Sequence, residues 1–499
     1  MGMAIRRGIV IVIGIILQIL LSLFSYLFIG ELFAIARFIY VILGFLLVLN
    51  LIKNSKSYSY ILPWIIIILL SPVIGSLLYV IIGRNKKKSK ILKNITKMTK
   101  ESKKYLLQDD NQKDKIAQNG KIKYLTDYSG YPASNNNDID YYSLGDYAYE
   151  DILEELKKAE KFIFFEYFIV AKGKFWNSIL QILEEKAADG VDVRVMYDDL
   201  GCISTLKSSY PKELKKKGIK CVAFNKLKPI GGVIMNNRDH RKILVIDGKV
   251  AFSGGINIAD EYININSKYG HWKDNCIKIS GDAVWNYTVM FLTIWNAFKN
   301  EDKDFIKYKF DFSNKKINNG CIIPYGETPL DDDITGEDVY LNIINQAEKY
   351  VYIMTPYLII DTDMINSLIL ATRRGVDVRI VIPGIPDKKM VYMVSESFVE
   401  PLVKGGVKVY RYTPGFVHSK VFVSDDKITT VGTINMDFRS LYLHFECGCY
   451  IESLDIVQEV KNDVIDTIEK SRIISAKEAT PKFFKSICQS LLRLVAPLM

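Results

Sequence analysis

Gly190-Val191-Asp192-Val193-Arg194 returns unchanged later in the chain as Gly375-Val376-Asp377-Val378-Arg379. Valine alternates with charged residues in both copies, which is typical of a β-strand entered through a glycine turn. The same succession of helical and strand patterns surrounds each copy, which indicates duplication of a whole structural unit. Alternating helices and strands predict an α/β fold with a sheet covered by helices. The expected helices are 149–159, 175–188, 339–349 and 363–374, and the expected strands are 162–170, 190–197, 350–360 and 375–382.

A second match supports the duplication. Lys217-Gly218-Ile219-Lys220 is echoed, in the same order, by Gly405-Gly406-Val407-Lys408. The polar stretch 299–320 is a natural seam between the copies. We therefore expect a first repeat over residues 140–305 and a second over 306–480, packed about a pseudo-twofold axis with one active site at their interface.

Both copies carry the same histidine motif. The chain has four histidines, and two of them begin the pattern His-x-Lys-x4-Asp. The two motifs are His240-Lys242-Asp247 and His418-Lys420-Asp425. Histidine and lysine two positions apart point to the same face of a strand, whereas the aspartate lies an odd number of residues further on. Within these candidate catalytic residues, we expect the His-Lys pairs to do chemistry and the aspartates to support the site structurally.

Two imidazoles in one site can divide the work of phosphoryl transfer. One attacks phosphorus and forms a phosphohistidine, and the other, protonated, gives its proton to the leaving alkoxide. The lysines and two amides, Asn257 and Asn435, would bind the phosphate oxygens and stabilise the transition state. An acid on the far nitrogen of each imidazole would fix its tautomer. Asp274 and Glu446 are the candidates for that orienting role.

A purely structural interpretation stays open for part of this set. One His-Lys strand could be an ordinary exposed edge, and asparagine after Gly-x-x is often a turn former. Two motifs in register within a repeat favour chemistry, whereas Asp274 and Glu446 are balanced between the two interpretations. His271 and His444 have no matching Lys and Asp, and we expect them to be non-catalytic.

The first 97 residues are expected to anchor the chain in a membrane. Residues 8–30 carry no charge, and this length exceeds the roughly 20 residues that cross a bilayer. Further apolar segments follow at 32–52 and at 61–83, the last interrupted by prolines. A cleaved signal peptide fits less well, because no small-x-small cleavage site ends the first segment. The pattern leaves open whether two or three segments span.

A basic cluster after the third segment predicts the orientation. Its members are Arg84, Lys86, Lys87, Lys88, Lys90, Lys93 and Lys97. The positive-inside rule puts this cluster in the cytoplasm. With three spans Arg6 and Arg7 would then face outside, and with two spans they would face inside. We expect a multi-pass protein of the cell membrane, a lysine-rich tether at 98–139, and a cytoplasmic body beside the anionic inner leaflet.

Composition limits the class of protein. The 499 residues are 49% hydrophobic and 24% charged, which excludes a disordered chain. Seven cysteines, an odd number without C-x-x-C spacing, exclude a disulfide scaffold and give no zinc pattern. The net charge of +10 indicates an anionic partner, which could be nucleic acid, an acidic membrane surface or phosphate esters.

Residues 481–499 form the last predicted element, an amphipathic helix. Its apolar residues recur at three- and four-residue steps, and its polar residues lie elsewhere on the helical wheel. The apolar residues are Phe484, Ile487, Leu491, Leu494 and Val495, and the polar ones are Lys482, Lys485, Gln489 and Arg493. The helix either packs on its own domain or lies on the inner leaflet beside the active site. The cationic side and the Phe483-Phe484 pair favour the leaflet.

The motifs resemble those of the phospholipase D superfamily, and more closely those of bacterial cardiolipin synthases of the phospholipase D type. Beside the two histidine motifs, the similar segments are 237–242, 251–258, 166–168, 355–357 and 437–440, with 57–64 and 71–75 in the anchor. The resemblance covers nearly the whole chain. The chain departs from the family pattern at 8–30, which looks like an added apolar segment beside the usual two.

The resemblance implies transfer of a phosphatidyl group from one phosphatidylglycerol to another, which gives cardiolipin and glycerol. It also implies a phosphohistidine intermediate, with His240 as nucleophile and His418 as acid and then base, and no metal, other cofactor or nucleotide donor. The same residues would serve a hydrolytic phospholipase D or another phosphodiesterase, including a nuclease. The apolar segments argue against a nucleic acid partner, because a lipid substrate explains both anchor and charge. Two intact motifs argue against a non-catalytic membrane scaffold.

Overall fold

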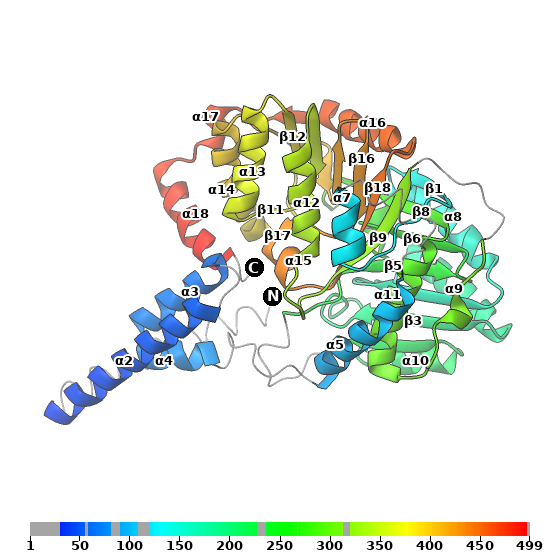
Figure 1. Ribbon diagram of the computed structural model, residues 1–499, viewed down its shortest axis with the longest axis horizontal. Coiled ribbons are helices and arrows are strands. Elements are labelled where there is room, and N and C mark those ends of the chain that lie inside the picture. Colours follow the sequence, from blue (N-terminus) through cyan, green and yellow to red (C-terminus); the bar gives the residue numbers. More distant parts are fainter. Residues whose placement is uncertain are drawn as a thin grey trace. The chain divides into compact units, whose positions relative to one another are not determined.

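The computed structural model describes residues 30–54, 58–80, 90–107, 120–226, 236–266, 268–312 and 320–496, which form two compact units (Figure 1). The first unit holds helices α2 (Gly30–Asn54), α3 (Tyr58–Leu70) and α4 (Pro72–Leu78), together with residues 490–496 at the end of the last helix. The second unit holds the α/β body, which contains every candidate site residue. The expected segment at 8–30 lies outside the described residues except for Gly30, as do Arg84 and Lys86 to Lys88 of the basic cluster.

The helices of the first unit leave many apolar side chains exposed. Phe38, Leu43 and Leu70 are 67%, 55% and 80% exposed, while a small cluster around Trp64 and Ile68 is buried. A search of the described residues finds no helix that combines the length and the apolar character required to cross a bilayer.

Residues 90–107 belong to the folded body, although 90–97 were expected in the anchor and 98–107 in the tether. They form α5 (Lys90–Ser102) and a short 3-10 helix, Lys103–Tyr105. Leu92 and Ile95 are buried, and the side-chain amide of Asn94 donates a hydrogen bond to the carbonyl of Ala297 (3.3 Å). Helix α7 (Gly120–Lys123) and a π-helical turn, Tyr124–Tyr128, follow. The lysine-rich helix α5 therefore packs on the body through a narrow apolar stripe. The polar composition of the segment gave no sign of this stripe.

The first half of the body is a seven-stranded mixed sheet with the strand order β1-β8-β6-β5-β2-β3-β4. Strands β2, β3 and β4 are parallel, and β5, β6, β8 and β1 join them in antiparallel pairs. The elements are β1 (Asn137–Tyr142), α8 (Gly145–Lys157), β2 (Phe162–Tyr167), α9 (Lys174–Ala188), β3 (Asp192–Asp198), α10 (Tyr210–Lys216), β4 (Lys220–Phe224), β5 (Lys242–Ile246), β6 (Val250–Gly254), the 3-10 helix η5 (Asp260–Ile263), β7 (His271–Lys273), β8 (Cys276–Gly281) and α11 (Val284–Lys299).

The second half repeats this topology in the sheet β19-β13-β12-β10-β15-β16-β18-β9, with β19 added at one edge. Its elements are β9 (Cys321–Glu327), α12 (Thr335–Gln346), β10 (Tyr350–Met354), β11 (Leu358–Ile359), α13 (Thr362–Arg373), β12 (Asp377–Pro383), α14 (Lys389–Lys404), β13 (Lys408–Tyr412), β14 (Gly415–Val417), β15 (Val421–Ser424), β16 (Ile428–Gly432), β17 (Met436–Asp437), α15 (Phe438–Tyr442), β18 (Glu446–Glu452), α16 (Ile456–Glu469), β19 (Ser471–Ile473), α17 (Ala476–Ala479) and α18 (Phe483–Val495).

The expected helices and strands of both repeats are confirmed, with differences at their ends. The largest difference is at 350–360, where one strand was expected and two, β10 and β11, form. Pro356 lies between them, and proline has no N–H to donate to a sheet ladder. The α/β class and the two sheet-containing halves are therefore as the repeat predicted.

The two halves share one hydrophobic core. Phe164 and Ile243 of the first sheet belong to the same buried cluster as Val423 and Cys447 of the second. Helix α11 lies within this cluster and is buried from Val284 to Ala297. Burial on every side explains its almost wholly apolar sequence, because a helix with no solvent-facing stripe has no amphipathic pattern.

Backbone pairing also joins the halves. Strand β14 of the second half pairs in parallel with β7 of the first, so that Gly415 lies opposite His271. A second parallel bridge joins Asp239 to Phe445. Gly415 suits this contact, because a Cβ there would lie 2.3 Å from the carbonyl oxygen of His271. These two pairings bring the two histidine motifs to the interface of the repeats.

Candidate active site

The backbone of each motif histidine is bonded to the opposite half. His240 lies two residues before β5, and its N–H donates to the carbonyl of Phe445 (2.9 Å). His418 lies between β14 and β15, and its N–H donates to the carbonyl of Lys273 (2.7 Å). The two contacts occupy equivalent positions in the repeat. Each half therefore fixes the backbone position of the other half's histidine.

The side chain of each motif histidine also contacts the opposite half, through a carboxylate. Nδ1 of His240 lies 2.9 Å from Oε2 of Glu446, and Nδ1 of His418 lies 2.6 Å from Oδ2 of Asp274. Each carboxylate belongs to the half that does not carry its histidine, and both carboxylates are fully buried. An ionised carboxylate accepts a hydrogen bond from the Nδ1–H of the imidazole. Nε2 of each ring is then the nitrogen available to a substrate.

The two carboxylates are themselves held in place. Glu446 also accepts a hydrogen bond at Oε2 from the hydroxyl of Thr433 (2.5 Å). Asp274 accepts one at Oδ1 from the backbone N–H of Asn275 (2.9 Å). Burial raises the pKa of Asp274, but the neighbouring His418 and Lys420 more than offset this, so that its pKa lies below the ordinary value. Asp274 is therefore an anion in the site.

The motif lysines are buried beside the histidines. Nζ of Lys242 donates to the carbonyl of His240 (2.5 Å), and Nζ of Lys420 donates to the carbonyl of His418 and lies 2.9 Å from its Nδ1. Each lysine is 1% exposed. Burial lowers the pKa of Lys242 to about 8 and that of Lys420 to about 7, although Glu446 and Asp274 favour the charged forms. An anionic ligand would restore their full charge.

Burial keeps both motif histidines neutral near pH 7. Burial lowers the pKa of His418 to about 4, with a further contribution from Lys420 against the opposing effect of Asp274. Burial also lowers the pKa of His240 well below its ordinary value, and Lys242, Lys420 and His418 add to this. A charge on one imidazole thus disfavours a charge on the other, as expected for two rings that share a site.

The motif aspartates lie away from the histidines. Asp247 accepts three backbone hydrogen bonds, from Glu160 (2.8 Å), Lys161 (2.7 Å) and Phe162 (2.8 Å). Asp425 accepts the equivalent three from Glu348 (2.8 Å), Lys349 (2.8 Å) and Tyr350 (2.9 Å). Each aspartate therefore ties the turn after the motif strand to the start of the central strand beside it.

The two asparagines differ from each other. The amide of Asn257 is used at both ends, because Oδ1 accepts from the N–H of Ile169 (3.0 Å) and Nδ2 donates to the hydroxyl of Tyr262 (2.8 Å). Asn435 is 6% exposed, and its Oδ1 has no hydrogen-bond partner among the described residues. Of the two asparagines, only Asn435 therefore has a side-chain atom, Oδ1, without a hydrogen-bond partner among the described residues. A phosphate contact from Asn257 requires the exchange of one of its two bonds.

His444, which was expected to be non-catalytic, lies beside His240 in the fold. Its ring centroid lies 5.7 Å from that of His240, and its Nδ1 lies 3.6 Å from Oε1 of Glu446. Its ring is buried, neither nitrogen has a hydrogen-bond partner among the described residues, and burial lowers its pKa to about 4. Its position relative to Glu446 matches that of Trp272 relative to Asp274, so alignment of the two repeats could have found it.

Two further aromatic rings flank the motif histidines. Phe168 packs edge-on against His240, with ring centroids 4.9 Å apart, and Tyr262 packs in the same manner against His418 at 5.3 Å. Trp272 lies 5.5 Å from His418, in the place that His444 takes beside His240. The remaining histidine, His271, bonds to the hydroxyl of Tyr412 (2.9 Å).

A buried ionic network supports the approach to His240. Asp198 accepts from Nε of Arg238 (3.1 Å) and from the N–H of Asp239 (3.0 Å). Arg241 pairs with Glu166 (2.6 Å) and Asp239 (3.1 Å) on the opposite side. Buried charges are retained only when they are paired, so these contacts fix the backbone on both sides of the histidine.

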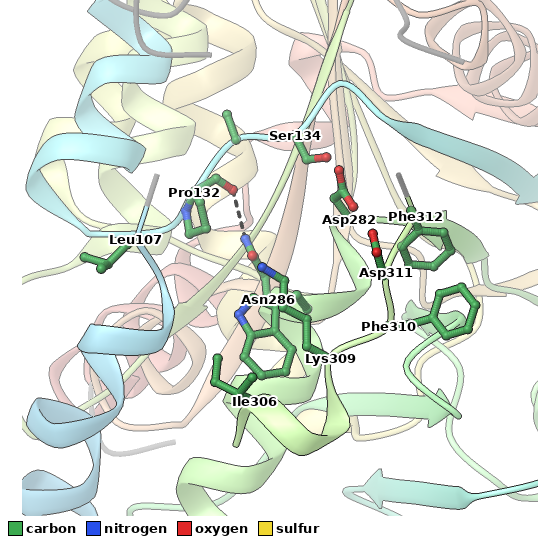
Figure 2. Close-up of a pocket in the computed structure, with 12 residues that line it drawn as sticks. Leu107, Pro132, Ser134, Asp282, Asn286, Ile306, Lys309, Phe310, Asp311 and Phe312 are labelled. Atoms are coloured by element: carbon green, nitrogen blue, oxygen red, sulfur yellow. Dashed lines mark hydrogen bonds between the residues drawn. The ribbon is translucent and has the colours of Figure 1, made fainter. Parts of the chain in front are cut away.

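A cavity elsewhere in the body and a group of possible metal ligands were compared with the histidine site. A cavity of about 450 Å³ lies among Ser134, Asp282, Asn286 and Phe312, and none of the candidate site residues lines it (Figure 2). Within the described residues, a search for metal-binding groups returns His240, His444 and Glu446, whose ligand atoms lie within 4.8 Å of one another. This group belongs to the histidine site already described.

Two related halves that exchange acids across one site define a phospholipase D-like protein. The family described as "Cardiolipin synthase, PLD-like domain" matches residues 152–295 and 340–466, and the family "Phospholipase_D-nuclease N-terminal" matches 41–84. The chain belongs to the family of phospholipase D-like cardiolipin synthases. The matched segments leave out residues 1–40, where the expected extra apolar segment lies.

Individual relatives agree with this family. A Streptococcus mutans protein described as uncharacterized is 42% identical over 91% of this chain and 99% of its own length. A protein named cardiolipin synthase from Staphylococcus aureus strain Mu50 is 32% identical over 89% of this chain and 92% of its own length. The crystal structure of phosphatidylserine synthase from Haemophilus influenzae Rd KW20 covers 76% of this chain and 98% of its own, with a TM-score of 0.57 and 16% identity, which concerns the fold alone.

The bonds of the motif aspartates lead to a stability prediction. Asp247→Ala leaves three backbone N–H groups without their acceptor, and we expect it to lower the free energy of unfolding by about 3 kcal/mol or more. Asp425→Ala should cost less, because its site is more exposed. Thermal unfolding in detergent measures both. The turnover per folded molecule should change by less than about threefold, and a large loss of turnover with an unchanged melting temperature would contradict the structural role.

Proposed function

We propose that this chain is a cardiolipin synthase, which transfers a phosphatidyl group between two phosphatidylglycerol molecules and releases glycerol. The observation that carries the proposal is the exchange of acids, which leaves Nε2 of His240 and of His418 free in one site. The similarity to proteins named cardiolipin synthase supports a second phosphatidylglycerol, rather than water, as the acceptor.

The first step forms a covalent intermediate. Nε2 of His240 attacks the phosphorus of phosphatidylglycerol, and the bond from phosphorus to the headgroup glycerol oxygen breaks. His418, protonated at Nε2, gives that proton to the leaving oxygen, so that glycerol departs neutral. The products of this step are phosphatidyl-His240, glycerol and neutral His418. Glu446 remains an acceptor at Nδ1 of His240 and stabilises the positive charge that forms on the ring.

The second step reverses the roles. A hydroxyl of the second phosphatidylglycerol gives its proton to Nε2 of His418 and attacks the phosphorus. The phosphorus–nitrogen bond breaks, which releases cardiolipin and returns His240 to the neutral form. His418 is left protonated and ready for the next first step, so that protons balance over the cycle.

Substrate binding supplies the protonated acid. The pKa of His418 is about 4 in the empty site, because burial and Lys420 outweigh Asp274. A phosphate diester brings one negative charge into the same buried region, where charges interact strongly, and it therefore raises the pKa values of His418 and of both lysines. We propose that proton uptake accompanies binding of the first phosphatidylglycerol.

The charge of the site comes from the protein. Lys242 and Lys420 are fully buried ammonium donors beside the histidines. We propose that the two lysines stabilise the phosphate oxygens in both transition states, with contributions from Asn257 and Asn435, and that no metal is needed.

We propose further that the chain works as a multi-pass protein of the cell membrane, with residues 1–97 as the anchor and the body in the cytoplasm. The uncharged stretch 8–30 and the exposed apolar side chains of α2 to α4, such as Phe38 and Leu70, support this proposal. A lipid substrate and a net charge of +10 agree with a place beside an anionic leaflet.

The two histidines generate the direct test of the proposed function. His240→Ala and His418→Ala should each abolish the formation of cardiolipin from labelled phosphatidylglycerol, with a melting temperature near that of the unchanged protein. His240→Ala should form no phosphatidyl adduct, since it lacks the nucleophile, whereas His418→Ala should form the adduct on His240 only slowly, since the leaving glycerol lacks its proton donor. A phosphatidyl adduct on His418 in His240→Ala would reverse the two roles, and phosphatidic acid as the main product of the unchanged protein would indicate a hydrolase.

The lysines predict the alkaline side of the pH profile. Burial lowers the pKa of Lys420 to about 7 and that of Lys242 to about 8, so their positive charges are lost as the pH rises through this range. The value of kcat/KM, which reports the free enzyme, should therefore fall more steeply above about pH 7, where Lys420 loses its charge, and kcat should show this fall only at higher pH. Lys420→Arg should move this steep limb upward, because arginine stays charged. A flat profile to pH 10 would contradict this.

Metal removal gives an independent test. Activity should persist in excess EDTA, whereas Lys242→Met or Lys420→Met should lower kcat by roughly a hundredfold, comparable to the loss of one oxyanion donor. Activity that disappears on chelation and returns with a single divalent ion would contradict the lysine-based stabilisation.

A further inference from the structure

Helix α18 packs on the body through its polar side. Nζ of Lys485 lies 2.8 Å from a carboxylate oxygen of Glu396, and Nε2 of Gln489 donates to the carbonyl of Met393 (3.5 Å). Gln489 is only 5% exposed. Both partners lie on α14, and Figure 1 shows the two helices next to each other. The contacts therefore join polar groups of α18 to α14.

The apolar side of α18 faces outward. Phe483 is 73% exposed, Phe484 81%, Ile487 45% and Leu491 60%. These residues recur at three- and four-residue steps and form one stripe along the helix. A terminal helix that packs to stabilise its own domain buries its apolar stripe, and α18 does the opposite. Such a stripe on a surface helix indicates an apolar partner outside the body.

The helix packed against α18 leads to the active site. Residues 485 and 489 contact residues 396 and 393, so the first turns of α18, up to Gln489, run antiparallel to α14. Lys388, just before the N-terminal end of α14, lies over the ring of Tyr357 at 5.5 Å. The ring of Tyr357 lies 6.4 Å from that of Phe416, which lies 6.0 Å from that of His418. Met390 in the first turn of α14 is 58% exposed. Helix α14 therefore contacts the first turns of α18 at Met393 and Glu396 and approaches the site at its N-terminal end.

We propose that α18 is an interfacial helix whose outward stripe inserts into the anionic leaflet that holds the lipid substrate, and that it orients the active site toward that leaflet. The inference rests on the proposed function for the identity of the substrate. The partner of the stripe could be a lipid surface or a second copy of this chain, and the charge around the stripe favours the lipid surface. Exposed Lys482, Lys388 and Lys389 accompany the stripe, and the whole chain carries a charge of +10. Anionic lipid complements these charges, whereas a second copy repeats them.

Cys488 provides a direct probe of insertion. It is exposed on α18, and the other cysteines are buried or partly buried. The full chain with Cys221→Ser and Cys321→Ser is labelled at Cys488 with an environment-sensitive fluorophore. It is then reconstituted in vesicles of phosphatidylcholine and phosphatidylglycerol with brominated acyl chains. We expect the bromine to quench the label. The added changes Phe483→Ser, Phe484→Ser and Leu491→Ser should remove most of the quenching.

Activity on two forms of the substrate tests the orienting role. In unlabelled protein, the triple serine variant should lose at least tenfold of its activity on bilayer phosphatidylglycerol. It should stay within about twofold on short-chain phosphatidylglycerol dispersed in detergent. Leu370→Ser on α13 is the matched control, since Leu370 is 54% exposed and lies on another helix of the body. It should leave both activities unchanged.

Three outcomes would overturn the inference. Equal losses on both substrates with a lowered melting temperature would show that α18 only supports the fold. An unquenched label in the unmutated helix would show that the stripe stays outside the lipid. A detergent-solubilised dimer that the triple variant converts to a monomer, without quenching, would assign the stripe to a second copy. The quenching readout needs no turnover, so a failure of the proposed function is separable from a failure of this inference.

Discussion

Each motif histidine is oriented by a carboxylate from the opposite half, and the rest of the site depends on this exchange. Glu446 and Asp274 are fully buried, and a buried carboxylate is costly unless it is paired and hydrogen-bonded. The histidine partner of each carboxylate lies across the interface. Neither half alone can therefore supply the imidazole that pairs with its own buried carboxylate. The parallel pairings of β7 with β14 and of Asp239 with Phe445 hold the backbones at the required register. Assembly of the halves and assembly of the catalytic group are therefore one event.

The two halves are related but not identical around the histidines, and the differences give each imidazole its own surroundings. His418 is enclosed by Trp272 and Tyr262, whereas His240 is enclosed by His444 and Phe168. A symmetric site would give two equivalent nucleophiles. A second imidazole next to Glu446 makes the environment of His240 more polar than that of His418, and this is a physical basis for a difference in role.

Periodicity and repetition predicted most of the body, because both report local geometry. The Val-Asp-Val-Arg strands, the flanking helices and the structural role of Asp247 and Asp425 followed from the spacing of residues. The docking of α5 was not predicted, because the buried Leu92 and Ile95 stand within a lysine-rich stretch. The place of His444 was missed because it has no motif partners in sequence and is brought to Glu446 only by the fold. The helix of residues 483–495 was expected, but which side of it meets the body depends on Glu396 and Met393, and no local pattern reports such partners.

The burial of α11 on all sides also bears on how the chain is made. The helix ends the first half, yet the side chain of Asn286 donates to the carbonyl of Pro324 in the second half (2.9 Å), and the core around it draws on both sheets. When only the first half has been released from the ribosome, α11 is a largely apolar helix with part of its cover still unmade. Transiently exposed apolar surface of this kind makes an incomplete chain prone to aggregation. The interval before the second sheet forms is therefore the stage of synthesis at which this body is most open to aggregation.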